Sequence, residues 1–137
     1  MPPKKILLAE DDADDRIFFS DFLKTRSDIH LIPAVENGEE VFNYLDKILE
    51  AADLPDLIIL DQNMPKRSGL QTLQLLKTRM TYKNIMVVIY STYADDNLRQ
   101  QSIDGGAELV FSKPYTPEGY HEMIDIMLDL FRQREPI

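Results

Sequence analysis

Five short apolar runs alternate with stretches of helical periodicity along the whole chain, and this alternation constrains the fold more than any other feature. The runs cover residues 6–9, 29–34, 57–60, 85–90 and 109–112. Unbroken apolar runs of this length are typical of strands buried on both faces. Parallel strands need crossover connections, which return over one face of the sheet with a right-handed hand. The pattern therefore predicts an α/β fold, a doubly wound parallel sheet with helices on both faces.

Helices are predicted between and after these strands, over residues 14–25, 39–52, 69–79, 95–104 and 116–132. Asn37-Gly38 precedes the second helix, and in Thr116-Pro117-Glu118 the threonine is an N-cap and the proline occupies the first helical position. On the last helix, apolar side chains recur at helical spacing, which predicts a buried face, with a dimer or partner surface as the alternative. These side chains are Tyr120, Ile124, Met127, Leu128 and Phe131.

Asp61 directly follows the apolar run 57–60 and is the candidate nucleophile. An Asp in this place lies at the carboxyl edge of the sheet, where ligands collect in open α/β folds. The alternative is that Asp61 only opens a turn, because Asp commonly bonds its own backbone in loops.

Acidic residues also follow the first run, in the sequence Glu10-Asp11-Asp12. Like charges ~4 Å apart repel by ~4 kcal/mol at an effective dielectric of ~20, so a cation is expected nearby. Carboxylates without a neighbouring histidine or thiol are typical of Mg²⁺ sites. The alternative treats Asp12, Asp14 and Asp15 as the N-cap and first turn of the next helix. It accounts for those three residues but less well for Glu10 and Asp11.

The fourth and fifth runs also end in polar side chains. Ser91-Thr92 supplies hydroxyl donors, and Lys113 offers three donors suited to a phosphoryl oxygen or a carboxylate. Each alone has an ordinary reading, as a loop hydroxyl or a solvated lysine. Chance is a poor explanation for acids, a hydroxyl and a lysine at the ends of four strands.

As an ordered set, these motifs resemble the receiver domain of two-component response regulators over nearly the whole chain. The matching motifs are Glu10-Asp11, Asp61-Gln62-Asn63-Met64-Pro65 with Gly69-Leu70, Ser91-Thr92, Gly106-Ala107 and Lys113-Pro114. The resemblance implies a flavodoxin-like sheet of five strands in the order 2-1-3-4-5 with five helices. It also implies that residues 1–137 form a single receiver domain.

What the resemblance implies for Asp61 is that it accepts a phosphoryl group from a histidine kinase or a histidine phosphotransfer protein. Asp11 and Asp61, the backbone carbonyl of Asn63 and, through water, Glu10 would hold Mg²⁺, with Mn²⁺ as an alternative. Lys113 would contact the phosphoryl group. Ser91 would act as the switch hydroxyl, next to Thr92.

Phosphoryl transfer relies on in-line positioning and charge neutralisation, so these residues need no protein general base. The protein would catalyse only its own phosphorylation and slow dephosphorylation, and is not expected to be an enzyme.

The output surface implied by the resemblance consists of the fourth helix, the fifth strand and the fifth helix. On it we expect a downstream protein target, or a second copy of the chain, to contact Leu98, Arg99, Gln101, Ser102, Tyr120 and Met123. The chain ends at Ile137, soon after the last helix, so we expect a stand-alone receiver, a monomer or a homodimer.

Two departures from the family pattern qualify these expectations. Val110 stands where many members have an aromatic switch residue, so we predict a change through residues 91–96 and the fourth helix, without a swing of Tyr90 or Phe111. Tyr93 lies two residues beyond Ser91, and we predict that it slows dephosphorylation together with Asn63 by impeding water.

Composition narrows the alternatives. The net charge of −9 without a basic cluster argues against binding to nucleic acid. No apolar stretch approaches the ~20 residues of a membrane span, and the start of the chain does not resemble a signal peptide, so a cytoplasmic location is expected.

A flavodoxin-type cofactor binder is disfavoured because the acids after the first strand would repel phosphate. A phosphatase of the haloacid dehalogenase type needs a D-x-D pattern there, which Glu10-Asp11-Asp12 does not supply. A degenerate receiver that acts as a phosphorylation-independent interaction module stays open.

Overall fold

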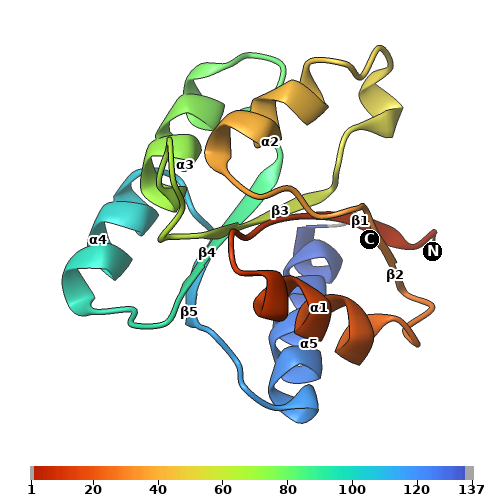
Figure 1. The fold of residues 1–137 in the computed structure, drawn as a ribbon. Helices are drawn as coiled ribbons and strands as arrows, with labels where there is room; N and C mark the ends of the chain where they lie inside the picture. The colour runs from red at the N-terminus through yellow and green to blue at the C-terminus, as the bar shows by residue number, and fades with distance from the viewer. Residues whose placement is uncertain (1, 135–137) are drawn as a thin grey trace.

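The computed structural model describes residues 2–134 of the chain as five parallel strands and five α-helices (Figure 1). The strands are β1 (Lys4–Ala9), β2 (Ile29–Leu31), β3 (Leu57–Asp61), β4 (Met86–Ser91) and β5 (Leu109–Ser112). The helices are α1 (Ala13–Leu23), α2 (Gly38–Leu45), α3 (Gly69–Thr78), α4 (Asp96–Asp104) and α5 (Pro117–Arg134), with a 3₁₀ turn at Ala51–Asp53. The strands are ordered β2-β1-β3-β4-β5, which confirms the predicted flavodoxin-like topology.

Helices cover both faces of the sheet, with α1 and α5 on one side and α2, α3 and α4 on the other (Figure 1). In β3, Leu57 and Ile59 pack in the core beneath α1 and α5, whereas Ile58 and Leu60 pack in the core beneath the other three helices. Because successive side chains of a strand point to opposite faces, a strand covered on both sides must be apolar at every position. This explains the unbroken apolar runs of the sequence.

Two predicted elements are shorter than expected. Strand β2 ends at Leu31 rather than at residue 34, because Pro33 has no N–H to donate to the ladder. Helix α2 ends at Leu45 rather than at residue 52. Leu45 is its last buried residue, Ile48 packs against the core from the segment after the helix, and Leu49 is almost fully exposed.

The predicted helix starts and the buried face of the last helix are confirmed. The Asn37 side chain accepts a hydrogen bond from the Glu40 N–H, and the Thr116 hydroxyl accepts one from the Gly119 N–H. On α5, four of the five predicted core residues are buried, and Phe131 packs half-buried against them.

The prediction of which residues lie on the output surface is partly wrong. Four of the six residues expected on it are buried, namely Leu98, Ser102, Tyr120 and Met123, whereas Arg99 and Gln101 are exposed. Helix α4 is so polar that its sequence does not reveal which face meets the sheet. The exposed apolar side chains on these elements and the loop between them are Ile103, Tyr115 and Ile126.

Within residues 2–134, none of the helices combines the length and the apolar character that crossing a bilayer requires.

Candidate functional site

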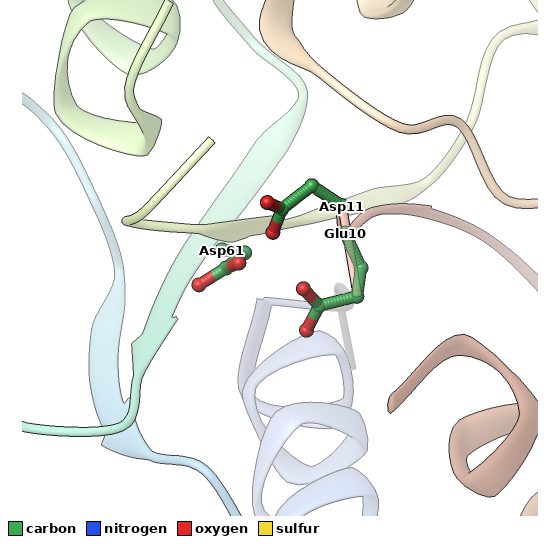
Figure 2. A group of neighbouring side chains, drawn as sticks. All are labelled: Glu10, Asp11 and Asp61. Carbon is green, nitrogen blue, oxygen red and sulfur yellow. The ribbon is translucent and has the colours of Figure 1, made fainter. Parts of the chain in front are cut away.

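Three carboxylates meet at the carboxyl edge of the sheet (Figure 2). Glu10 and Asp11 follow β1, and Asp61 is the last residue of the neighbouring strand β3, in a register that pairs Ala9 with Leu60. One carboxylate oxygen from each of the three residues lies within 4.8 Å of the others. Asp11 is exposed, but Glu10 and Asp61 are only 0% and 1% accessible. The predicted gathering of acids from β1 and β3 is therefore present.

Lys113 places its amine among these carboxylates from the loop after β5. Its Nζ lies 2.8 Å from Glu10 Oε1, 3.0 Å from Asp15 Oδ2 and 3.4 Å from Asp61 Oδ1. The Lys113 backbone N–H donates to the Ser91 carbonyl at 2.8 Å, which fixes the loop against the end of β4. One amine faces several carboxylates, so negative charge is in excess.

Burial and neighbours shift the pKa values of the two buried acids in opposite directions. For Glu10, burial acts to raise the pKa, but hydrogen bonds with Asp61, Lys113 and Tyr90 outweigh it and hold the pKa below its ordinary value. For Asp61, burial together with the hydrogen bond and charge of Glu10 raises the pKa to about 8. Burial acts to lower the pKa of Lys113, but its carboxylate partners raise it, so the amine stays charged. Additional positive charge in the pocket would favour the ionised form of Asp61.

The donor set fits a hard divalent cation. It consists of carboxylate oxygens, with two of the three acids buried and one open to solvent. Mg²⁺ prefers oxygen ligands and binds through one or two carboxylates while keeping several waters. Glu10, Asp11 and Asp61 are therefore the residues that would hold it.

The other predicted site residues surround this cluster less closely. Ser91 ends β4 and is buried, and its hydroxyl donates to the Tyr93 carbonyl at 3.3 Å, within its own loop. Thr92 is exposed, and Tyr93 is 77% exposed. Asn63 is exposed, and its backbone N–H donates to Asp61 Oδ1 at 3.3 Å.

Two residues of the pocket were not predicted as site residues. Asp15 was assigned to the first turn of α1, where it does lie, with its N–H bonded to Asp12, but its carboxylate also pairs with Lys113. Tyr90 was assigned to the strand core, yet its hydroxyl donates to Glu10 Oε1 at 2.6 Å. The available signal for Tyr90 was a phenol inside an apolar run, because a buried tyrosine hydroxyl needs a partner.

The start of α3 lies directly against Asp61. A Cβ atom on Gly69 would lie 2.6 Å from the Asp61 carbonyl oxygen, so only glycine fits there. The Gly69 N–H donates to the Gln62 carbonyl at 3.1 Å, and the Gln62 side chain accepts from the Leu70 N–H at 2.9 Å. The backbone beside the candidate nucleophile is therefore tied to the first turn of α3.

Two curated relatives are response regulators. Response regulator Rcp1 of Synechocystis sp. is 34% identical over 93 residues, which cover 66% of this chain and 63% of the relative. Response regulator protein VraR of Staphylococcus saprophyticus is 30% identical over 123 residues, covering 89% of this chain and 55% of the relative. The chain thus spans between 55% and 63% of the length of these two relatives.

Solved structures have the same fold. The Mn²⁺-bound form of response regulator Rcp1 superposes with a TM-score of 0.77 at 26% identity, covering 98% of this chain and 99% of that one. The phosphorylated cyanobacterial phytochrome response regulator RcpA gives a TM-score of 0.79 at 27% identity, covering 98% and 97%. The family model of the response regulator receiver domain matches residues 6–125, which include every residue of the acidic pocket. The chain therefore belongs to the response regulator receiver domain family.

Proposed function

We propose that the protein is a phosphoryl-accepting receiver in which Asp61 takes a phosphoryl group from a histidine kinase or a histidine phosphotransfer protein, in a Mg²⁺-dependent reaction. The observation that carries this proposal is the buried cluster of Asp61 with Glu10 and Asp11, with the Lys113 amine 3.4 Å from Asp61. The Mn²⁺-bound structure of Rcp1 supports a divalent cation in this fold.

The chemistry assigns each residue a simple role. An ionised oxygen of Asp61 attacks phosphorus, the phosphorus–nitrogen bond of the donor phosphohistidine breaks, and the bonding electrons go to the imidazole nitrogen. The Asn63 N–H holds the Asp61 carboxylate, and the Lys113 amine neutralises charge on the phosphoryl oxygens. A cation held by Glu10, Asp11, Asp61 and the Asn63 carbonyl would supply further positive charge there. The protein would act on itself only, rather than as an enzyme with a separate substrate.

Intact-mass measurement after incubation with acetyl phosphate and Mg²⁺ tests this proposal. The protein should gain the mass of one phosphoryl group, and Asp61→Asn should gain none. Asp56→Asn is the matched control, because Asp56 accepts a hydrogen bond from the Lys5 N–H next to the opposite end of β3, and this variant should still gain the mass. A wild-type protein without any gain would favour the alternative, a phosphorylation-independent interaction module.

We further propose that the signal leaves through the loop after β4 and through α4. The Arg99 side chain of α4 connects this loop to β5, since it donates to the Ala94 carbonyl at 3.2 Å and to the Val110 carbonyl at 2.8 Å. When the Ser91 hydroxyl turns from the Tyr93 carbonyl to a phosphoryl oxygen, the loop held by Arg99 must adjust. Tyr90 is fully buried and bonded to Glu10, so a phosphomimetic complex should leave its ring in place, and an exchange of Tyr90 or Phe111 between buried and exposed positions would contradict this.

The exposed Tyr93 ring is proposed to slow hydrolysis of the acyl phosphate, together with Asn63. Tyr93→Ala should shorten the half-life of the phosphorylated protein several-fold, because water would reach the pocket more easily. Tyr115→Ala, which removes another exposed tyrosine, should leave the half-life as it is. An unchanged half-life in Tyr93→Ala would refute the role of the ring.

Downstream, we propose a protein target that contacts the exposed side chains of Ile103, Tyr115 and Ile126 on or between α4 and α5. The chain would act as a monomer or a homodimer. A cytoplasmic location stays a prediction, which cell fractionation would test.

A further inference from the structure

Tyr90 is a fully buried tyrosine whose hydroxyl ends in the acidic pocket. Strand β4 pairs Tyr90 with Asp61 of β3 in parallel register. The Tyr90 ring packs in the core beneath α1 and α5, and its hydroxyl donates to Glu10 Oε1 at 2.6 Å. The Lys113 amine lies 5.2 Å from the ring centroid. Tyr90 therefore contacts the acid and the cation that border the candidate nucleophile.

The protein itself occupies most of the hydrogen-bonding capacity of Glu10. An ionised carboxylate has about four lone-pair sites on its two oxygens. Tyr90 and Lys113 both bind Oε1, at 2.6 and 2.8 Å. The Asp12 N–H donates to Oε2 at 3.2 Å. The hydrogen bond between Glu10 and Asp61 needs a proton, so it is lost when a cation favours the ionised form of Asp61. Of the two Glu10 oxygens, Oε2 then has capacity left for a further ligand, whereas Oε1 is occupied by Tyr90 and Lys113.

We propose that Tyr90 is a positioning residue that restricts Glu10 to one oxygen toward a bound cation and thereby favours Mg²⁺ over Ca²⁺. The inference rests on the proposed function, because it assumes that the pocket binds a divalent cation. Mg²⁺ requires a compact octahedral shell and keeps several waters, whereas Ca²⁺ accepts six to eight oxygens and can bind a carboxylate through both of its oxygens. A Glu10 side chain released from Tyr90 could turn and offer two oxygens, which suits the larger ion.

The test is calorimetric titration of the metal-free protein with MgCl₂ and, separately, with CaCl₂. Tyr90→Phe removes only the hydroxyl and keeps the ring in the core. In this variant the affinity for Mg²⁺ should fall by about tenfold, as is usual when an outer partner of a metal ligand is removed. The affinity for Ca²⁺ should fall less or rise, so the preference for Mg²⁺ should decrease. Tyr90→Phe with the wild-type preference would overturn the role of Tyr90 and leave the proposed function intact.

Tyr82→Phe is the matched control. The Tyr82 hydroxyl donates to Asp46 Oδ1 at 2.5 Å, and its ring packs in the other core, beneath α2, α3 and α4. This variant also loses one bond from a buried tyrosine to a carboxylate, and it should keep both wild-type metal affinities. Urea unfolding of the metal-free variants checks that each of them folds. An equal loss of both affinities in the two variants would overturn the proposal, because it would indicate a general loss of stability. Wild-type protein that binds neither ion would refute the metal-dependent function itself.

Discussion

In two places in this molecule, acidic side chains surround one basic side chain. The two clusters differ in burial and in charge balance. In the Arg26 cluster, the guanidinium binds both oxygens of Asp28 at 2.9 and 2.7 Å and one oxygen of Asp125 at 2.7 Å. The two carboxylate side chains are 44% and 63% exposed. In the acidic pocket, Lys113 pairs with three carboxylates, and two of them, Glu10 and Asp61, are almost inaccessible to solvent.

The same residue type responds in opposite ways in the two clusters. The bond to Arg26 lowers the pKa of Asp28, whereas burial next to Glu10 raises the pKa of Asp61 to about 8. The Arg26 cluster connects the turn after α1 to α5, and solvent screens its charges. The pocket instead concentrates charge that the folded protein alone does not neutralise. Such an arrangement destabilises the fold, and it is the arrangement that the proposed binding of a cation and a phosphoryl group requires.

The largest expected effect comes from removing the amine of the pocket. Lys113→Met should reduce the rate of phosphorylation by acetyl phosphate about 100-fold, because it removes a donor that stabilises charge in the transition state. Lys66→Met is the control, since this exposed lysine pairs with Glu39 at 3.7 Å on the surface, and it should keep the wild-type rate. Time courses of intact mass measure both rates. A wild-type rate in Lys113→Met would show that the amine has only a structural role.

The second prediction concerns the stability of the metal-free protein. Asp61→Asn should raise the free energy of unfolding at pH 7 by roughly 2 kcal/mol, because folding of the wild type must keep Asp61 protonated far above its ordinary pKa of 3.8, whereas the amide carries no such cost. Urea unfolding without divalent cations measures the change. A destabilised Asp61→Asn would contradict the view that the pocket carries excess charge.

The pH dependence of the same pair of proteins sharpens this test. The pKa of Asp61 is about 8 in the folded protein, above its ordinary value of 3.8, so between these values the folded state holds a proton that the unfolded chain has lost. Stability from this group therefore falls as pH rises from about 4 to about 8, by at most about 1.4 kcal/mol per pH unit. The difference in stability between Asp61→Asn and wild type should grow over that range. Saturating Mg²⁺ should reduce this difference in stability. A difference that stays constant from pH 4 to pH 8 would exclude Asp61 as its source.

The smallest effect is expected in the Arg26 cluster. Asp28→Asn should lower the free energy of unfolding by less than about 1 kcal/mol, since exposed ion pairs contribute little. The pKa of Asp28 is lowered in the folded protein, so its contribution is present at neutral pH and disappears as pH falls below about 4. Urea unfolding at pH 7 and pH 3 compares the two states. If Asp28→Asn lowered the free energy of unfolding by as much as Asp61→Asn raises it, the two clusters would not differ in their energetic contribution.

The sequence was sufficient for the sheet and for the main site residues because both follow from simple rules. A strand buried on two faces is apolar throughout, and the carboxyl ends of adjacent parallel strands share one edge. Glu10, Asp61 and Lys113 could therefore be expected near one another before any coordinates.

The missed features depend on long-range packing. Tyr90 looks like any aromatic residue of a core strand, and only the fold shows that its hydroxyl reaches Glu10. Helix α4 has few apolar residues, so the burial of Leu98 and Ser102 was not visible in its periodicity. Helix α2 ends at its last fully buried residue, Leu45, and local propensity does not encode that point.

Gly69 makes α3 a fixed reference point of the molecule. Because the first turn of α3 touches the backbone of Asp61 without an intervening side chain, this helix cannot shift without displacing the nucleophile itself. Helix α4 packs on the core through Leu98, and the flexible side chain of Arg99 supplies polar contacts to the Ala94 and Val110 carbonyls. A fluorescence reporter would therefore place its stationary dye on α3 and its responsive dye on α4.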